Sequence, residues 1–162
     1  DLFFYLIQLA GEKKFEYLAP ELQNAGAYGF FSLMRELYVA GIRFARENPE
    51  FAEMSKKLME SKGMPIYEEI MASNMPSVYD FFETLLEKAV ARGEVRADVD
   101  IKLFAYLIAS LNTLVLEYYT EQVSSEYDEK MLTTVDPFID FLSRGIGASP
   151  IAAPSHSKGA SP

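Results

Sequence analysis

The residues that most often carry catalysis are nearly absent from this chain. Histidine occurs once, as His156 near the carboxyl end, and cysteine does not occur among the 162 residues. A nucleophile activated by histidine, and most zinc sites, therefore lack the side chains that they require. Adjacent acids such as Glu68 and Glu69 could transfer protons, but acids in the first turn of a helix also complement its dipole. The sequence predicts no enzyme, no catalytic residue, no metal and no cofactor.

Methionine and tyrosine point instead to the binding of an apolar molecule. Six of the seven methionines fall between Met34 and Met75. Methionine is unbranched and polarisable, which suits a wall that fits several ligands, and tyrosine adds a ring with one orienting hydroxyl. An ordinary core uses the same residue types, so both interpretations stay open. Helical position selects as candidate ligand-binding residues Met34, Tyr38, Met59, Tyr67, Met71, Met75, Phe82 and Asn112.

Asn112 is the most informative polar residue, because it lies deep in the apolar run 101–119. Leaving a buried amide without a partner costs about 1–3 kcal/mol, so Asn112 requires one. The partner could be a neighbouring carbonyl, a symmetry-related subunit or a ligand. Small side chains on the same run would let another helix approach closely, within the chain or from a second copy. These small residues are Ala105, Ala109, Ser110 and Thr113.

The elements that position these residues are helical throughout. Apolar residues recur at spacings of three and four, and no hairpin signal interrupts them. Pro20 predicts that the first helix ends near Leu18, and Pro76 predicts a kink or a restart in the fourth. We expect an all-α antiparallel bundle of about six helices, with a loop over 21–27. The expected helices cover 1–18, 28–47, 49–62, 65–93, 101–122 and 125–146.

Several helix boundaries carry specific signals. Asn48 followed by a proline and an acid predicts a helix start. Gly93 suits the left-handed position that ends a helix, and Asp100 can cap the next one. Ser125-x-x-Asp128 resembles a capping box for the last helix. Asp136-Pro137 offers a second start, so we expect that the last helix could be broken.

The last two helices carry more apolar surface than one partner face can hide. Two copies that meet about a two-fold axis would bury the surplus in a four-helix bundle, so the sequence permits a homodimer. The candidate dimer-interface residues are Ala105, Ala109, Thr113, Leu132, Val135, Ile139 and Leu142.

Charge and composition limit the partners of the chain. With 15 basic and 24 acidic residues the formal net charge is −9, which repels phosphate backbones. The longest apolar run, 101–119, includes Lys102, Asn112 and Glu117, and no basic signal segment opens the chain. We therefore expect a cytoplasmic protein that enters no membrane. Residues 1–147 form the expected domain, and the Ala-, Ser- and Pro-rich range 148–162 reads as a disordered tail.

Two segments resemble the tetracycline-repressor (TetR) family of transcriptional regulators. The range 91–100, Ala-Arg-Gly-Glu-Val-Arg-Ala-Asp-Val-Asp, is similar to the family's Ala-Arg-Gly-Glu-(Leu/Ile)-Arg-x-Asp-(Leu/Val)-Asp segment. The range 141–147, Phe-Leu-Ser-Arg-Gly-Ile-Gly, is similar to its Leu-Leu-x-Arg-Gly-Leu-Gly ending. In that family the first segment joins the last pocket-forming helix to the first dimerisation helix. The resemblance covers about residues 1–147.

The resemblance implies that the chain is the effector-binding and dimerisation half of a repressor. A small hydrophobic effector would bind among the first four helices of a homodimer and shift them. Operator DNA would be bound only through an N-terminal helix-turn-helix, which is not represented in this sequence. The alternative is a helical carrier or binding module for lipid-like molecules with no role on DNA.

Overall fold

The computed structural model describes residues 2–148, with the side chain of Ala25 left out. This part of the chain is all-α, as the sequence predicts, and contains no strand, only an isolated bridge between Val95 and Gly147. The helices are α1 (Leu2–Gln23), α2 (Ala25–Tyr28), α3 (Phe30–Glu47), α4 (Pro49–Glu60), α5 (Pro65–Ala91), α6 (Ile101–Gln122), the 3₁₀ helix η1 (Glu129–Met131) and α7 (Leu132–Ile146). The expected tail, including His156, lies outside the described residues.

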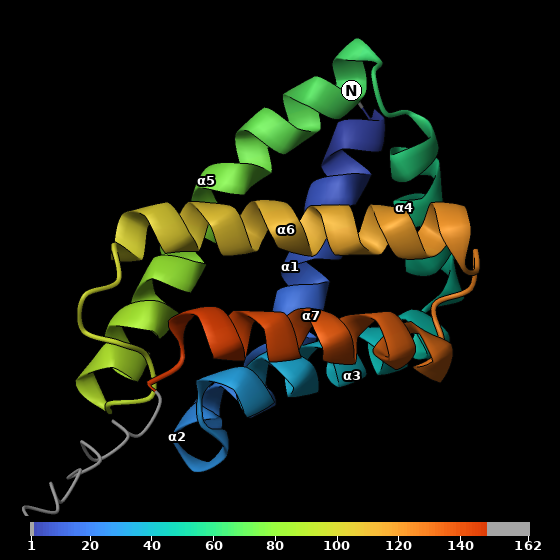
Figure 1. Cartoon of the computed structure of the whole chain (residues 1–162). Coiled ribbons are helices and arrows are strands. Elements are labelled where there is room, and N and C mark those ends of the chain that lie inside the picture. The colour runs from blue at the N-terminus through green and yellow to red at the C-terminus, as the bar shows by residue number, and fades with distance from the viewer. Residues whose placement is uncertain (1, 149–162) are drawn as a thin grey trace, which may run out of the picture.

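The helices cross one another around a shared interior (Figure 1). Helices α6 and α7 run side by side in opposite directions at the front, with α1 behind them. Helix α6 packs mainly on α5, α7 packs on α3, and α3 packs on α1. The interior is therefore enclosed by α3, α5, α6 and α7, which come from both halves of the chain.

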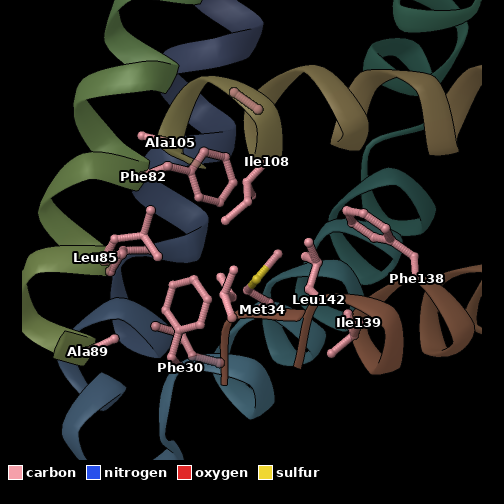
Figure 2. Close-up of a cluster of buried hydrophobic side chains, with 14 of the residues drawn as sticks. Phe30, Met34, Phe82, Leu85, Ala89, Ala105, Ile108, Phe138, Ile139 and Leu142 are labelled. Atoms are coloured by element: carbon pink, nitrogen blue, oxygen red, sulfur yellow. The ribbon is translucent and has the colours of Figure 1, made fainter. Parts of the chain in front are cut away.

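The core is built from the apolar stripes of these four helices (Figure 2). Phe30 and Met34 of α3 meet Phe82 of α5 and Ile108 of α6, and each of these side chains is buried. Leu142 closes the same cluster from α7. Burying such side chains provides most of the free energy of folding, at about 1.5–3 kcal/mol for each large one.

Pro20 and Pro76 do not end their helices, so the expected end near Leu18 and the expected restart at Pro76 are absent. Helix α1 continues through Pro20, α5 is one helix through Pro76, and most of the expected loop 21–27 is helical. A proline within a helix leaves the carbonyl four residues earlier without its N–H donor. Those carbonyls belong to Glu16 and Ala72, which are both exposed, so water can hydrate them. Pro20 and Pro76 are tolerated because they lie on solvent-exposed faces of their helices.

The junction between α5 and α6 has the conformation that its residues predict. Gly93 has a φ of 75°, the left-handed value that glycine adopts without strain. The Asp100 carboxylate accepts a hydrogen bond of 3.0 Å from the Leu103 N–H and so caps α6.

Other helix starts differ from their sequence signals. Asn48 stands at the start of α4, but its side chain donates to the Phe44 carbonyl instead of capping. The expected capping box from Ser125 is not formed, because Asp128 itself caps η1 by accepting from the Lys130 N–H. Helix α7 is continuous through Pro137, so the expected break is absent.

Glu94 fastens the α5–α6 junction to the start of α3. Its carboxylate accepts a 2.8 Å hydrogen bond from the Phe30 N–H, 64 residues away, and a 3.0 Å bond from Arg92 Nε. The φ of Gly29 is 72°, and a side chain there would lie 3.6 Å from Glu94 Oε1. The carboxylate therefore serves as a long-range N-cap, which satisfies a helix donor that local residues leave open.

The same junction also holds the end of α7. The Arg96 N–H donates to the Ile146 carbonyl at 3.0 Å, and the Ala148 N–H donates to the Glu94 carbonyl at 2.9 Å. One short segment thus fixes the start of α3, the end of α5 and the end of α7. The two motifs, 91–100 and 141–147, therefore lie against each other and are joined by main-chain hydrogen bonds.

Helix α6 is long and apolar enough to be considered as a membrane span by length and composition, the one such helix among the described residues. Its mean hydropathy is 1.3, which core helices of water-soluble proteins also reach. Here the inner face of α6 is covered by α5 and buries Ala105, Ile108 and Ala109. Only 22% of the apolar window of α6 is buried among the described residues, so this helix has one core face and a further exposed apolar face.

We predict that Glu94→Ala lowers the free energy of unfolding by about 1–2 kcal/mol, because it removes the cap of α3. Urea unfolding at pH 7 measures this loss, and Glu87→Ala on the exposed face of α5 serves as the control.

The loss should also depend on pH. Arg92 and the Phe30 N–H hold the pKa of Glu94 below its ordinary 4.5. A carboxylate with a lowered pKa stabilises the fold above its unfolded value and loses that contribution as pH falls through the folded value. The difference between wild type and Glu94→Gln should therefore shrink below about pH 4.5. A difference that stays constant from pH 7 to below pH 4.5 would contradict the proposed role of the Glu94 carboxylate as the cap of α3.

Candidate ligand-binding site

Two polar residues that the sequence selects meet inside the bundle. The Tyr38 hydroxyl of α3 donates a hydrogen bond to the Asn112 carboxamide oxygen of α6, although the two residues are 74 positions apart. Both side chains are half-buried. The partner found for Asn112 is a tyrosine of the same chain, which is not among the three partners that the sequence left open.

The Tyr38–Asn112 pair leaves hydrogen-bond donors on Asn112 that no residue in the range 2–148 uses. Burial raises the pKa of the Tyr38 hydroxyl above its ordinary value, so the hydroxyl stays protonated and donates. The Asn112 amide nitrogen makes no hydrogen bond within residues 2–148. Every fully buried side-chain nitrogen or oxygen in that range has a hydrogen-bond partner, so the Asn112 nitrogen is not fully buried. The amide N–H groups therefore retain access to space large enough for water. They can donate to the oxygen of a bound molecule.

Several apolar residues of the candidate set belong to the core cluster on which Tyr38 packs. Met34 and Phe82 belong to the buried core, and Tyr38 and Met75 pack against it. Figure 2 shows Met34 and Phe82 reaching from α3 and α5 toward the same space. The structure thus places Met34, Phe82, Tyr38 and Met75 in or against one core cluster, and Tyr38 links that cluster to Asn112.

A second polar pair lies nearer the end of α6. Lys62 Nζ bonds to Glu117 Oε2 at 2.7 Å, and Glu117 is only 8% exposed. Next to this pair is a cavity of about 370 Å³ between α4, the end of α6 and the segment that follows it. The cavity is lined by Lys56, Met59, Glu60, Lys62, Thr120, Glu121, Ser125 and Tyr127.

The remaining candidate residues divide between these places. Met59 lines the 370 Å³ cavity, and Tyr67 is buried, with its pKa raised by burial and by the nearby Glu117 charge. Met71 is half-buried on α5, and nothing in the structure places it beside either polar pair. The structure therefore does not gather all eight residues into one pocket.

The residues selected for a dimer interface lie on the inner side of their helices. Ala105, Ala109 and Val135 are at most 1% exposed, and they pack within the chain's own core. Ile139 and Leu142 are buried there as well, while Thr113 and Leu132 are half-buried. Small and apolar side chains serve core and interface equally, so residue type could not separate the two. Another face is left for any second copy.

That face is an apolar stripe on the outside of α6. Leu103, Leu107, Leu114 and Tyr118 are 36–55% exposed. At roughly 100° per residue they fall within about 60° of one another, nearly opposite Ala105 and Ala109. Phe141 of α7 is 66% exposed. Large apolar side chains in a continuous row are typical of surfaces that another molecule covers.

Sequence reasoning missed Lys62 and Glu94, because each acts on a partner far along the chain. Glu117 carried a signal that could have been used. It is a charge in an otherwise apolar run, and the argument applied to Asn112 also requires a partner for it. No comparable signal indicated Lys62, since an exposed lysine next to a glycine turn is ordinary.

We predict that Tyr38→Phe costs about 1 kcal/mol of stability or more, because it leaves the Asn112 carboxamide oxygen without its donor. In a double-mutant cycle with Asn112→Leu, the second substitution should cost clearly less once the first is present. Urea unfolding of the four proteins measures the coupling. Fully additive losses would show that the two side chains do not interact in solution.

Comparisons with known proteins identify the fold. No family model and no curated protein sequence matches the chain. Among solved structures, a TetR family transcriptional regulator from Chloroflexus aurantiacus superposes with a TM-score of 0.64 at 24% sequence identity. The match covers 92% of this chain and 73% of that one. The chain therefore has the helical fold seen in that regulator.

Proposed function

We propose that this chain is the effector-binding and dimerisation domain of a TetR-type transcriptional regulator. A small hydrophobic or amphipathic molecule binds between α3, α5 and α6, against Tyr38 and Asn112. Its binding shifts the helices and thereby changes the DNA affinity of an attached helix-turn-helix. The acidic charge of −9 is consistent with a domain that senses and does not itself touch DNA.

The observation that carries this proposal is the Tyr38–Asn112 pair. An isolated polar pair in an apolar interior contributes little to stability compared with well-packed apolar side chains. It does, however, orient a ligand, because it supplies a few placed donors and acceptors among soft walls such as Met34 and Met75. The fold shared with the Chloroflexus aurantiacus regulator supports the role in transcription.

The exposed stripe on α6 supports the homodimer. Leu103, Leu107, Leu114 and Tyr118 with Phe141 of α7 would pack on their copies about a two-fold axis and form a four-helix bundle. This surface takes the place of the residues selected from the sequence, five of which, Ala105, Ala109, Val135, Ile139 and Leu142, are buried in the chain's own core. In such a dimer the ligand pair and the interface share α6, on its opposite faces.

That arrangement gives a route from ligand to DNA. A ligand shifts an equilibrium only through its different affinities for two states. Asn112 lies on the helix that joins the two copies, and Tyr38 lies on α3, which packs on α1. A molecule that separates this pair would move α3 and α1 relative to the dimer axis. The spacing of two DNA-reading units attached before α1 would change in consequence.

Binding of a neutral apolar probe tests the site. We predict that Nile red binds the chain with increased fluorescence, and that Tyr38→Phe and Asn112→Leu each change its affinity or emission. The control Asn24→Leu alters an exposed asparagine between α1 and α2 and should leave both unchanged. If all three variants behave like wild type, the Tyr38–Asn112 pair is not the ligand site.

A matched pair of tyrosine substitutions tests the dimer. Tyr118 on the stripe and Tyr28 on α2 are 55% and 45% exposed. We predict that Tyr118→Glu converts the dimer to monomer in sedimentation velocity, because two buried carboxylates would face each other near the axis, and that Tyr28→Glu leaves it a dimer. A wild-type chain that sediments as a monomer at micromolar concentration would overturn the interface.

A further inference from the structure

Glu117 is the one buried charged residue among residues 2–148. An ionised carboxylate loses much of its hydration on burial and needs a cation in compensation. Lys62 supplies that cation at 2.7 Å. Nothing in the site described around Tyr38 requires this charge, and an apolar residue would fill the same place on α6 at lower cost.

Lys62 is held less firmly than its partner. Its side chain is half exposed, whereas that of Glu117 is 10% exposed. It stands in the turn between α4 and α5, next to Gly63 with a φ of 83°. The hydrogen bond to Glu117 raises the pKa of Lys62, so its ammonium is charged at neutral pH. A long, flexible and charged side chain of this kind can leave its partner when another cation takes its place.

The cavity of about 370 Å³ meets the ion pair at Lys62, which both lines the cavity and bonds Glu117. The lining carries two carboxylates, Glu60 and Glu121, and the ammonium groups of Lys56 and Lys62. Glu117 is not on the lining but bonds Lys62 at 2.7 Å, so an outward turn of Lys62 would open a path from the space to a third carboxylate and leave one ammonium, that of Lys56. The net charge of the opened cavity is negative, which favours a cation.

The walls of the cavity suit the rest of such a ligand. Met59 contributes a polarisable thioether and Tyr127 an aromatic ring. Methionine adapts to irregular apolar groups, and the face of an aromatic ring attracts a cation. Tyr67 lies close to the Glu117 charge from the side of α5. An ammonium group with an apolar body matches both the charge and the surface.

We propose that this cavity binds a small organic cation, an ammonium with an apolar body, which replaces Lys62 as the partner of Glu117. This second site lies apart from the Tyr38–Asn112 pair and goes beyond the proposed function, because it binds a different class of molecule. Displacement of Lys62 releases the turn that leads into α5. Helix α1 contacts both α4 and α5, and in Figure 1 this turn lies at the same end of the molecule as the N-terminus.

A pair of probes that differ only in charge tests the proposal. Benzyltrimethylammonium carries the cation, and neopentylbenzene has carbon in place of nitrogen. Binding to the full chain is followed by NMR of the methionine methyl groups at pH 7. We expect the cation to bind roughly tenfold more tightly than its neutral isostere and to shift the Met59 methyl resonance.

Substitutions at the ion pair assign the effect to Glu117. Glu117→Gln should weaken cation binding roughly tenfold, and Lys62→Met should strengthen it, because the competing ammonium is gone. Glu53→Gln removes the same charge from an exposed position on α4 and should change little. Circular dichroism checks that each variant is folded, and Lys62→Met keeps the test valid if Glu117→Gln unfolds.

The possible results separate this proposal from the proposed sensor function. Equal binding of both probes, or cation binding unchanged in Glu117→Gln and Lys62→Met, would overturn the cation site. The sensor function would stand if Nile red still responds to changes at Tyr38 and Asn112. Cation binding that follows the two variants supports the site even in a chain that is indifferent to Nile red.

Discussion

The burial of α6 is the constraint on which the rest of the structure depends. This helix is apolar on nearly every side, so one face packs on α5 while the outer stripe remains open. Its two polar groups on buried sides, Asn112 and Glu117, each need a partner from elsewhere in the chain. They find Tyr38 and Lys62, which come from α3 and from the turn between α4 and α5. The folding of α6 therefore ties together distant segments.

Both polar contacts have a character that suits sensing better than stability. Lys62 is half exposed beside the nearly buried Glu117, and the Asn112 amide nitrogen retains access to water, so a ligand could compete for either contact. In contrast, the contacts of Glu94 with the start of α3 and of its neighbours with the end of α7 are main-chain and cap bonds. These fix the frame of the domain. The structure thus separates the hydrogen-bonded junction at 92–100 from the two polar pairs along α6.

The fold could be predicted from sequence because helical periodicity and turn residues act locally. Gly93 and Asp100 adopt their expected roles, and the all-α class is confirmed. The helix end expected before Pro20 and the restart expected at Pro76 were wrong, because a proline is tolerated inside a helix when the carbonyl that it leaves unpaired faces solvent. The sequence does not show which face of a helix is exposed. Asn112 and Tyr38 could be selected as polar residues in apolar surroundings. That they bond each other could not, since residues 74 apart meet only through tertiary packing.

The measurement that tests the central claim most directly is native mass spectrometry of the purified chain. The claim is that α6 holds a small molecule on its inner side and a second copy on its outer side. It predicts a species of two chains that carries a small-molecule adduct, which is released on collisional heating before the copies separate. A monomer without any adduct, at concentrations where the chain is folded, would contradict it.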